Sequence, residues 1–209
     1  MFLSAKNAVT VEQVLGSIRL LTRLLPFIFE KDNLIEENFF WKSFDGSCPL
    51  GDKLAEAVVD LAFVPEFSIP ALSDQHVCYT VWEQGIGCQT KKTSPGNIIS
   101  NRMEVLRLML VLMARSMYVP SNCLSINVNR FLVFFTSRLD RNASLSLTLS
   151  LLNVVSNYNP TGWLPYNHVF FSDFQDSYVV TCSHCLVCLL DFVMPDCASE
   201  KVSIIFILE

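Results

Sequence analysis

The sequence is poor in charge. Asp, Glu, Lys and Arg make up 17% of the 209 residues, while apolar residues reach 51%; an average soluble domain has about 25% charged residues. Acidic residues outnumber basic ones by 20 to 15, and Lys91-Lys92 is the one adjacent basic pair. Nucleic-acid binding needs a row of basic side chains to contact successive phosphates, and this sequence has none. Nucleic acid is therefore excluded as a partner. The shortage of charge predicts apolar surfaces that are covered by a further part of the same protein, by another subunit or by a membrane.

Long apolar runs are also missing. A transmembrane helix needs about 20 consecutive apolar residues, and the best run, Leu106–Ala114, contains Arg107 and is followed by Arg115. The first ten residues have neither the basic start nor the apolar core of a signal peptide. Phe2 stands where N-myristoylation requires Gly. The sequence therefore predicts no membrane span, signal peptide or myristoyl anchor.

Histidine is scarce, and cysteine is too sparse for a disulfide scaffold. The three histidines are His76, His168 and His184, and none lies in a recognisable nucleophile motif. The eight cysteines mostly lie in apolar segments or singly in connectors. This usage is typical of reduced thiols in the cytosol.

One cluster of thiols and imidazole is a candidate metal or thiol site: Cys182, His184, Cys185 and Cys188. These side chains suit zinc, but a closed site needs four ligands within tetrahedral reach. On one helix, Cys188 lies about 240° around the axis from Cys182, and no second Cys-x2-Cys pair exists. We interpret the cluster as buried structural thiols, with a small metal-binding or thiol enzyme as the alternative. We assign no catalytic, cofactor-binding or metal-binding residue and no cofactor.

The N-terminal segment shows helical periodicity. Thr10–Gln13 has the form of a capping box and predicts a helix start. Pro26 predicts a kink or an end, and residues 30–37 read as a charged loop. The helix has two apolar stripes, so only the positions near Arg19 and Arg23 are predicted to face solvent. The first stripe comprises Val14, Ile18, Leu21 and Leu25. The second comprises Leu15, Leu20, Leu24 and Ile28.

Further helices are predicted along the chain. Asp52 is a candidate cap for a helix through Val64, and Asn101 for a helix through Val119. The second of these has an apolar stripe of Leu106, Leu110, Met113 and Met117. Residues 66–99 form an irregular connector, in which Trp82-Glu83 is a candidate helical turn. Phe131–Phe135 fits a short helix or a strand, and a last helix runs from Asp176 through Phe192.

Ser144–Leu151 carries conflicting signals. Serine or threonine alternates with leucine, which is the period of a half-buried strand. Leu145, Leu149 and Leu152 also fit a helix, and no partner strand is evident nearby. We predict a helix here.

The predicted fold is all-α. The chain is interpreted as a single helical region over residues 1–209, with an irregular connector at 66–99 and an uncertain tail at 196–209. Successive amphipathic helices favour stacked antiparallel pairs in an α-solenoid-like array, a fragment of a longer helical protein. The break at Asn159–Gly162, within Leu151–Asp173, predicts an ordered, aromatic connector between helices.

Four stretches together resemble the N-terminal portion of the high-temperature-induced dauer-formation protein family, which is related to dymeclin. They are RLLTRLLPFIFE (Arg19–Glu30), WEQGIG (Trp82–Gly87), NRMEVLRLMLVLMARSMYVP (Asn101–Pro120) and LLNVVSNYNPTGWLPYNHVFFSD (Leu151–Asp173). The run from Pro165 to Asp173 is the most specific of them.

The resemblance implies a non-enzymatic, mostly helical cytosolic protein. It implies peripheral attachment to Golgi membranes, and a role in protein sorting and in the formation of secretory (dense-core) vesicles. Family members are several times longer and contact the membrane through a myristoylated glycine, where this chain has Phe2. We therefore expect a scaffold or adaptor with protein partners, cytoplasmic and peripheral on the Golgi.

Overall fold

The computed structural model describes residues 2–31, 33–43, 46, 48–70, 77–86, 94–119, 128–158 and 173–192. No residue within these ranges lies in a β-strand, although Pro65 and Ile69 form an isolated bridge. The predicted all-α fold is confirmed. In chain order the elements are α1 (Phe2–Glu30), α2 (Asn33–Glu36), the π-helix η1 (Glu37–Trp41), α3 (Leu50–Leu61), α4 (Gly96–Met113), the 3₁₀ helix η2 (Ala114–Tyr118), α5 (Arg130–Val133), the π-helix η4 (Phe134–Arg138), α6 (Arg141–Ser156) and α8 (Asp173–Leu190).

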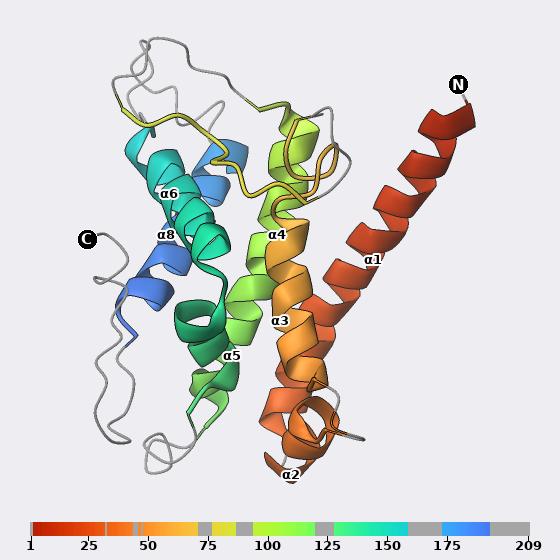
Figure 1. The fold of residues 1–209 in the computed structure, drawn as a ribbon, viewed down its shortest axis with the longest axis vertical. Helices are drawn as coiled ribbons and strands as arrows, with labels where there is room; N and C mark the ends of the chain where they lie inside the picture. The colour runs from red at the N-terminus through yellow and green to blue at the C-terminus, as the bar shows by residue number, and fades with distance from the viewer. Residues whose placement is uncertain are drawn as a thin grey trace.

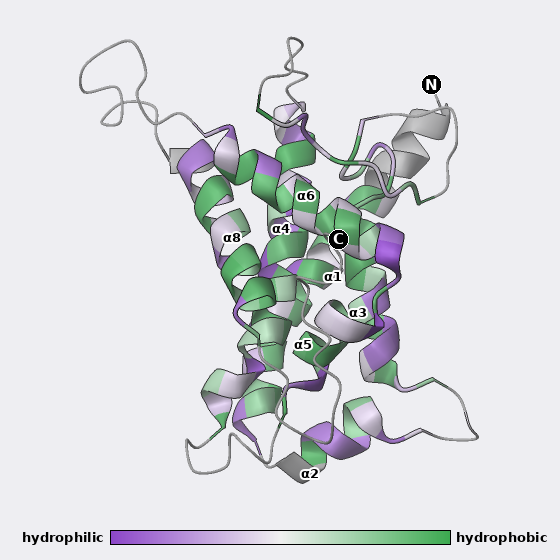
Figure 2. Cartoon of the chain, turned by 60° about the vertical axis from the view of Figure 1, so that its left-hand side comes forward, coloured by the Kyte–Doolittle hydropathy of each residue, from purple (hydrophilic) through white to green (hydrophobic). Residues whose placement is uncertain are grey.

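Helix α4 lies at the centre of the fold and contacts α1, α3 and α8 (Figure 1). Its buried side chains include Val105, Leu106, Leu108 and Leu112, which form a broad apolar side, whereas the Arg107 side chain on the remaining side is 42% exposed. A broad apolar side of this kind is expected where a helix packs against several neighbours. Apolar residues also predominate along the neighbouring helices (Figure 2).

The α4 segment differs from its prediction at both ends. The helix begins at Gly96, so Asn101 is no cap; its side-chain amide instead donates to the Phe67 carbonyl at 2.8 Å. At the other end the chain tightens into η2. This change of winding turns Met117 outward, where 85% of its surface is exposed, and the predicted stripe is wrong at that position.

Helix α1 extends in both directions beyond its prediction. It begins at Phe2 instead of Thr10, and it continues through Pro26 to Glu30. Leu25 and Phe29, on either side of the proline, are buried, so tertiary packing holds the last turn despite the missing backbone donor. Toward its N-terminus α1 leaves the other helices (Figure 1).

The predicted loop at residues 30–37 is wrong in part, because α2 and η1 lie there. The wide turn of η1 buries Phe40 and Trp41 side by side and leaves Phe39 half exposed. The Trp41 ring lies against Gly51 of α3, where an added Cβ would come within 2.7 Å of it. Glycine at position 51 is thus required by this close approach.

Helix α3 begins at Leu50 and ends at Leu61, somewhat earlier than predicted. Pro49 occupies the capping position, and Asp52 lies in the first turn. There the Asp52 carboxylate pairs with Arg138 of η4 at 3.2 Å. A first-turn carboxylate is also favoured by the helix dipole.

The remaining predictions have mixed outcomes. Ser144–Leu151 lies within α6, so the helix prediction is confirmed, and residues 131–135 are helical. Trp82-Glu83 forms a bend without a helical turn. Helix α8 begins at Asp173, and Asp176 accepts a hydrogen bond from the Tyr158 hydroxyl in place of the predicted cap. Asn159–Gly162, His168 and the tail 196–209 lie outside the described residues.

Candidate functional site

The four residues of the candidate metal or thiol site all lie on α8, where they do not converge. Cys182 and Cys185 are fully buried, and the Cys185 thiol faces the Leu106 carbonyl of α4 at 3.9 Å. His184 is exposed and Cys188 is half-buried. No group of three or more metal-ligating side chains comes together anywhere in the part of the chain that the structure describes.

The environment of these thiols also disfavours reactivity. Burial raises the pKa of Cys182 to about 12, and burial likewise raises the pKa of Cys185 and of Cys188. The nucleophile and the metal ligand are the thiolate form, which a raised pKa suppresses at neutral pH. The buried thiols of α8 therefore act in this structure as core packing groups.

A second polar constellation joins an extended segment to α6. We call residues 77–86 the strap; it crosses near the ends of α4 and α6 (Figure 1). Polar side chains of α6, spaced by three or four residues, bond its backbone. Ser146 donates to the Tyr79 carbonyl at 2.8 Å, Ser150 accepts from the Trp82 N–H at 3.1 Å, Asn153 donates to the Glu83 carbonyl at 2.8 Å, and Asn157 donates to the Gln84 carbonyl at 2.7 Å.

This contact accounts for Ser146 and Ser150, two of the polar residues whose alternation with leucine has the period of a strand. Extended backbone without a partner strand leaves its N–H and carbonyl groups without hydrogen bonds, which is costly when they are buried. Residues 146, 150, 153 and 157 share one helical face and supply the missing partners. The serines and asparagines of α6 thus do for the strap what a neighbouring strand would do.

The strap is anchored by Trp82, which is 6% exposed. Its indole Nε1 donates to the Ala62 carbonyl at 2.9 Å, and its ring lies under the Arg102 guanidinium, 5.0 Å from the ring centroid. Arg102 of α4 is itself fully buried, and its Nε donates to the Ser68 carbonyl. One arginine therefore connects the central helix to two parts of the irregular connector.

Arg102 has no carboxylate at ion-pair distance among the described residues, and its Nη1 and Nη2 atoms have no hydrogen-bond acceptor there. Burial lowers the pKa of Arg102, because the charged form loses water. Tyr178 of α8 lies nearby: burial raises the pKa of its hydroxyl, Cys182 adds to this increase, and the Arg102 guanidinium opposes it. The guanidinium is held by a carbonyl and an aromatic face.

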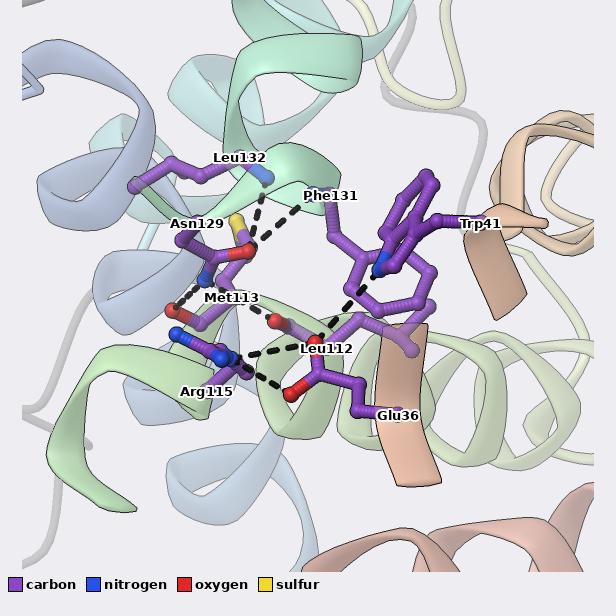
Figure 3. Close-up of polar contacts among 8 residues, drawn as sticks. All are labelled: Glu36, Trp41, Leu112, Met113, Arg115, Asn129, Phe131 and Leu132. Atoms are coloured by element: carbon purple, nitrogen blue, oxygen red, sulfur yellow. Dashed lines mark hydrogen bonds and ion pairs between the residues drawn. The ribbon is translucent and has the colours of Figure 1, made fainter. Parts of the chain in front are cut away.

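A third buried polar cluster, at the far end of α4, is an ion pair (Figure 3). The Arg115 Nε donates to both carboxylate oxygens of Glu36, at 3.1 and 2.8 Å, and the Trp41 indole approaches the same carboxylate at 3.5 Å. Arg115 and Glu36 are 7% and 5% exposed. The pair fixes α2 and η1 to the end of the α4–η2 stretch.

Asn129 completes this end of the molecule (Figure 3). Its amide nitrogen donates to the carbonyls of Leu112 and Met113, at 3.1 and 2.8 Å. These carbonyls lie at the C-terminal end of α4, where no N–H group of the same helix is available to them. Its oxygen accepts from the backbone N–H groups of Phe131 and Leu132 at the start of α5. A single side chain therefore caps the C-terminus of α4 and the N-terminus of α5.

In chemical terms, the two buried arginine clusters and the α6 polar face join segments of the chain. None of the three combines a nucleophile with a base within reach. The described helices also include none that is long and apolar enough to cross a bilayer.

Comparison with known proteins gives the family. A sequence profile of the high-temperature-induced dauer-formation protein (Hid1) family matches residues 2–204. The chain belongs to this family.

Three relatives of this chain are 30% to 35% identical to it. The human "Protein HID1" is 35% identical over 215 residues, covering 90% of this chain and 27% of its own length. The mouse protein of the same name is 35% identical over 204 residues, covering 85% and 25%. The fission yeast (Schizosaccharomyces pombe) "Ubp5-interacting protein ftp105" is 30% identical over 134 residues, covering 60% and 14%. This chain therefore spans about a quarter of the length of the human and mouse relatives, and no solved structure matches it.

Sequence reasoning predicted the helices that carry these clusters, and it missed the clusters. The sequence assigns no role to Arg102, marks Arg115 only as the end of an apolar run, and places Glu36 in a charged loop. One signal was present: Arg102 is four residues before Leu106 and seven before Met109, so it falls on the apolar side of α4, where a charged residue must find partners inside the protein.

Proposed function

We propose that this chain acts as a non-enzymatic scaffold or adaptor in protein sorting at the Golgi and in the formation of secretory (dense-core) vesicles. Membership of the Hid1 family across residues 2–204 carries the proposal. A role in that traffic is what the family resemblance implies, and none of the relatives' names denotes a catalytic activity.

The geometry supports a binding role over a catalytic one. Arg102 and Arg115 of the α4–η2 stretch and Ser150 of α6 are engaged in joining segments of the chain, and the buried thiols of α8 are neutral packing groups at physiological pH. One relative is named for an interaction with another protein, Ubp5, which is the kind of activity that a scaffold performs. We infer that this chain likewise acts through protein partners, without a cofactor.

The proposed location is the cytoplasm, peripheral on Golgi membranes. Membrane contact is proposed for the full-length family member. The charge balance of −5 and the absence of a basic tract in the sequence favour protein partners over nucleic acid.

The proposal is tested in secretory cells from which the endogenous family member has been deleted. A tagged form of this chain is expressed, and its overlap with a Golgi marker and the fraction of cargo stored in dense-core granules are measured. The control is Glu36→Gln, which breaks the buried ion pair, beside Glu37→Gln, which changes an exposed one.

We expect Golgi enrichment and partial recovery of stored cargo for the original chain and for Glu37→Gln, and loss of both for Glu36→Gln. A folded chain that stays diffuse and leaves cargo storage unchanged contradicts the proposal. That result would indicate that the chain is a helical interaction domain with no role in Golgi sorting.

A further inference from the structure

We draw no further inference here: the strongest candidate, the exposed apolar stripe of Leu20, Leu24 and Phe27 along the outward side of helix α1, carries none because nothing in the structure shows what covers it, since Arg23 and the exposed carboxylates of Glu12 and Glu30 lie along the same line of the helix and their mixed charge favours no one occupant.

Discussion

Arg115 and Arg102 lie on the same continuous helical stretch, at nearly the same depth, and their charges are compensated in different ways. Arg115 meets the carboxylate of Glu36 and forms an ion pair with it. Arg102 meets the Ser68 carbonyl and the face of Trp82, and no carboxylate lies at ion-pair distance among the described residues. The two arginines therefore differ in the kind of partner that compensates the charge, and they hardly differ in burial.

The difference predicts which residues are indispensable. In a buried ion pair each charge depends on the other, so removal of one strands its partner in a medium of low dielectric constant. A buried cation held by neutral groups strands nothing charged when it is removed. We expect the Arg115 end of α4 to be sensitive to single substitutions, and the Arg102 end to be more tolerant.

The largest expected effect is at Glu36. Glu36→Gln leaves the Arg115 charge buried without its carboxylate, and we expect a loss of about 3–5 kcal/mol in the free energy of unfolding. Urea denaturation followed by circular dichroism measures it. The double variant Glu36→Leu/Arg115→Met is expected to recover much of this stability. If the double variant is as unstable as the single one, the ion pair is not the cause.

A smaller effect is expected at the other arginine. Arg102→Met removes the donor to the Ser68 carbonyl and strands no opposite charge, so we expect a loss of about 1–3 kcal/mol. The same denaturation experiment on Arg115→Met provides the comparison, with a larger loss expected. Equal losses for the two variants would show that depth, and not the partner, sets the cost.

Alkaline pH is expected to lower the free energy of unfolding through Cys182 of α8. Burial raises the pKa of Cys182 to about 12, so above the ordinary thiol pKa the unfolded chain releases this proton before the folded chain does. Stability then falls as pH rises, by at most about 1.4 kcal/mol per pH unit for this group. Unfolding at pH 7, 9 and 10.5 measures the slope.

The control for this slope is Cys182→Ala. It is expected to lower stability at every pH, because it leaves a cavity. Its decline between pH 9 and 10.5 is expected to be shallower than that of the original chain. Parallel curves would mean that other buried groups, such as Tyr178 and Cys185, account for the alkaline loss.

The smallest effect is expected for an exposed arginine with a carboxylate partner. Arg130 pairs with Glu37 at 3.0 Å, and both side chains are 52% exposed. Because water screens this pair, we expect Arg130→Gln to cost about 0.2–1 kcal/mol in the same denaturation assay. A loss as large as that of Glu36→Gln would show that a partner matters irrespective of burial.

The helices were predictable because their determinants are local. The stripe of Val14, Ile18, Leu21 and Leu25 predicted the buried side of α1, and Ile18 and Leu25 lie in the core. Helical arithmetic also anticipated that Cys182 and Cys188 would point apart, and the structure places them at different depths on α8.

The polar contacts were not predictable because they join residues far apart in the sequence. Glu36 and Arg115 are separated by 79 positions, and Trp82 and Ser150 by 68. Nothing local marks either pair. The second apolar stripe of α1 illustrates the same limit, since periodicity showed that Leu20 and Leu24 are apolar and could not show that no neighbouring helix covers them.

The hydrogen bonds from α6 to the strap constrain the strap's backbone and place little constraint on most of its side chains. Ser146, Asn153 and Asn157 bond main-chain atoms, which every amino acid provides. Residue identity along the strap therefore matters chiefly at Trp82, whose indole donates to the Ala62 carbonyl, and at Tyr79, whose hydroxyl donates to the Asp60 carboxylate at 2.6 Å. Exposed positions such as Thr80 and Ile86 can therefore change with little effect on these bonds. A deletion within the strap would shift the backbone out of step with the helix and break several of these bonds at once.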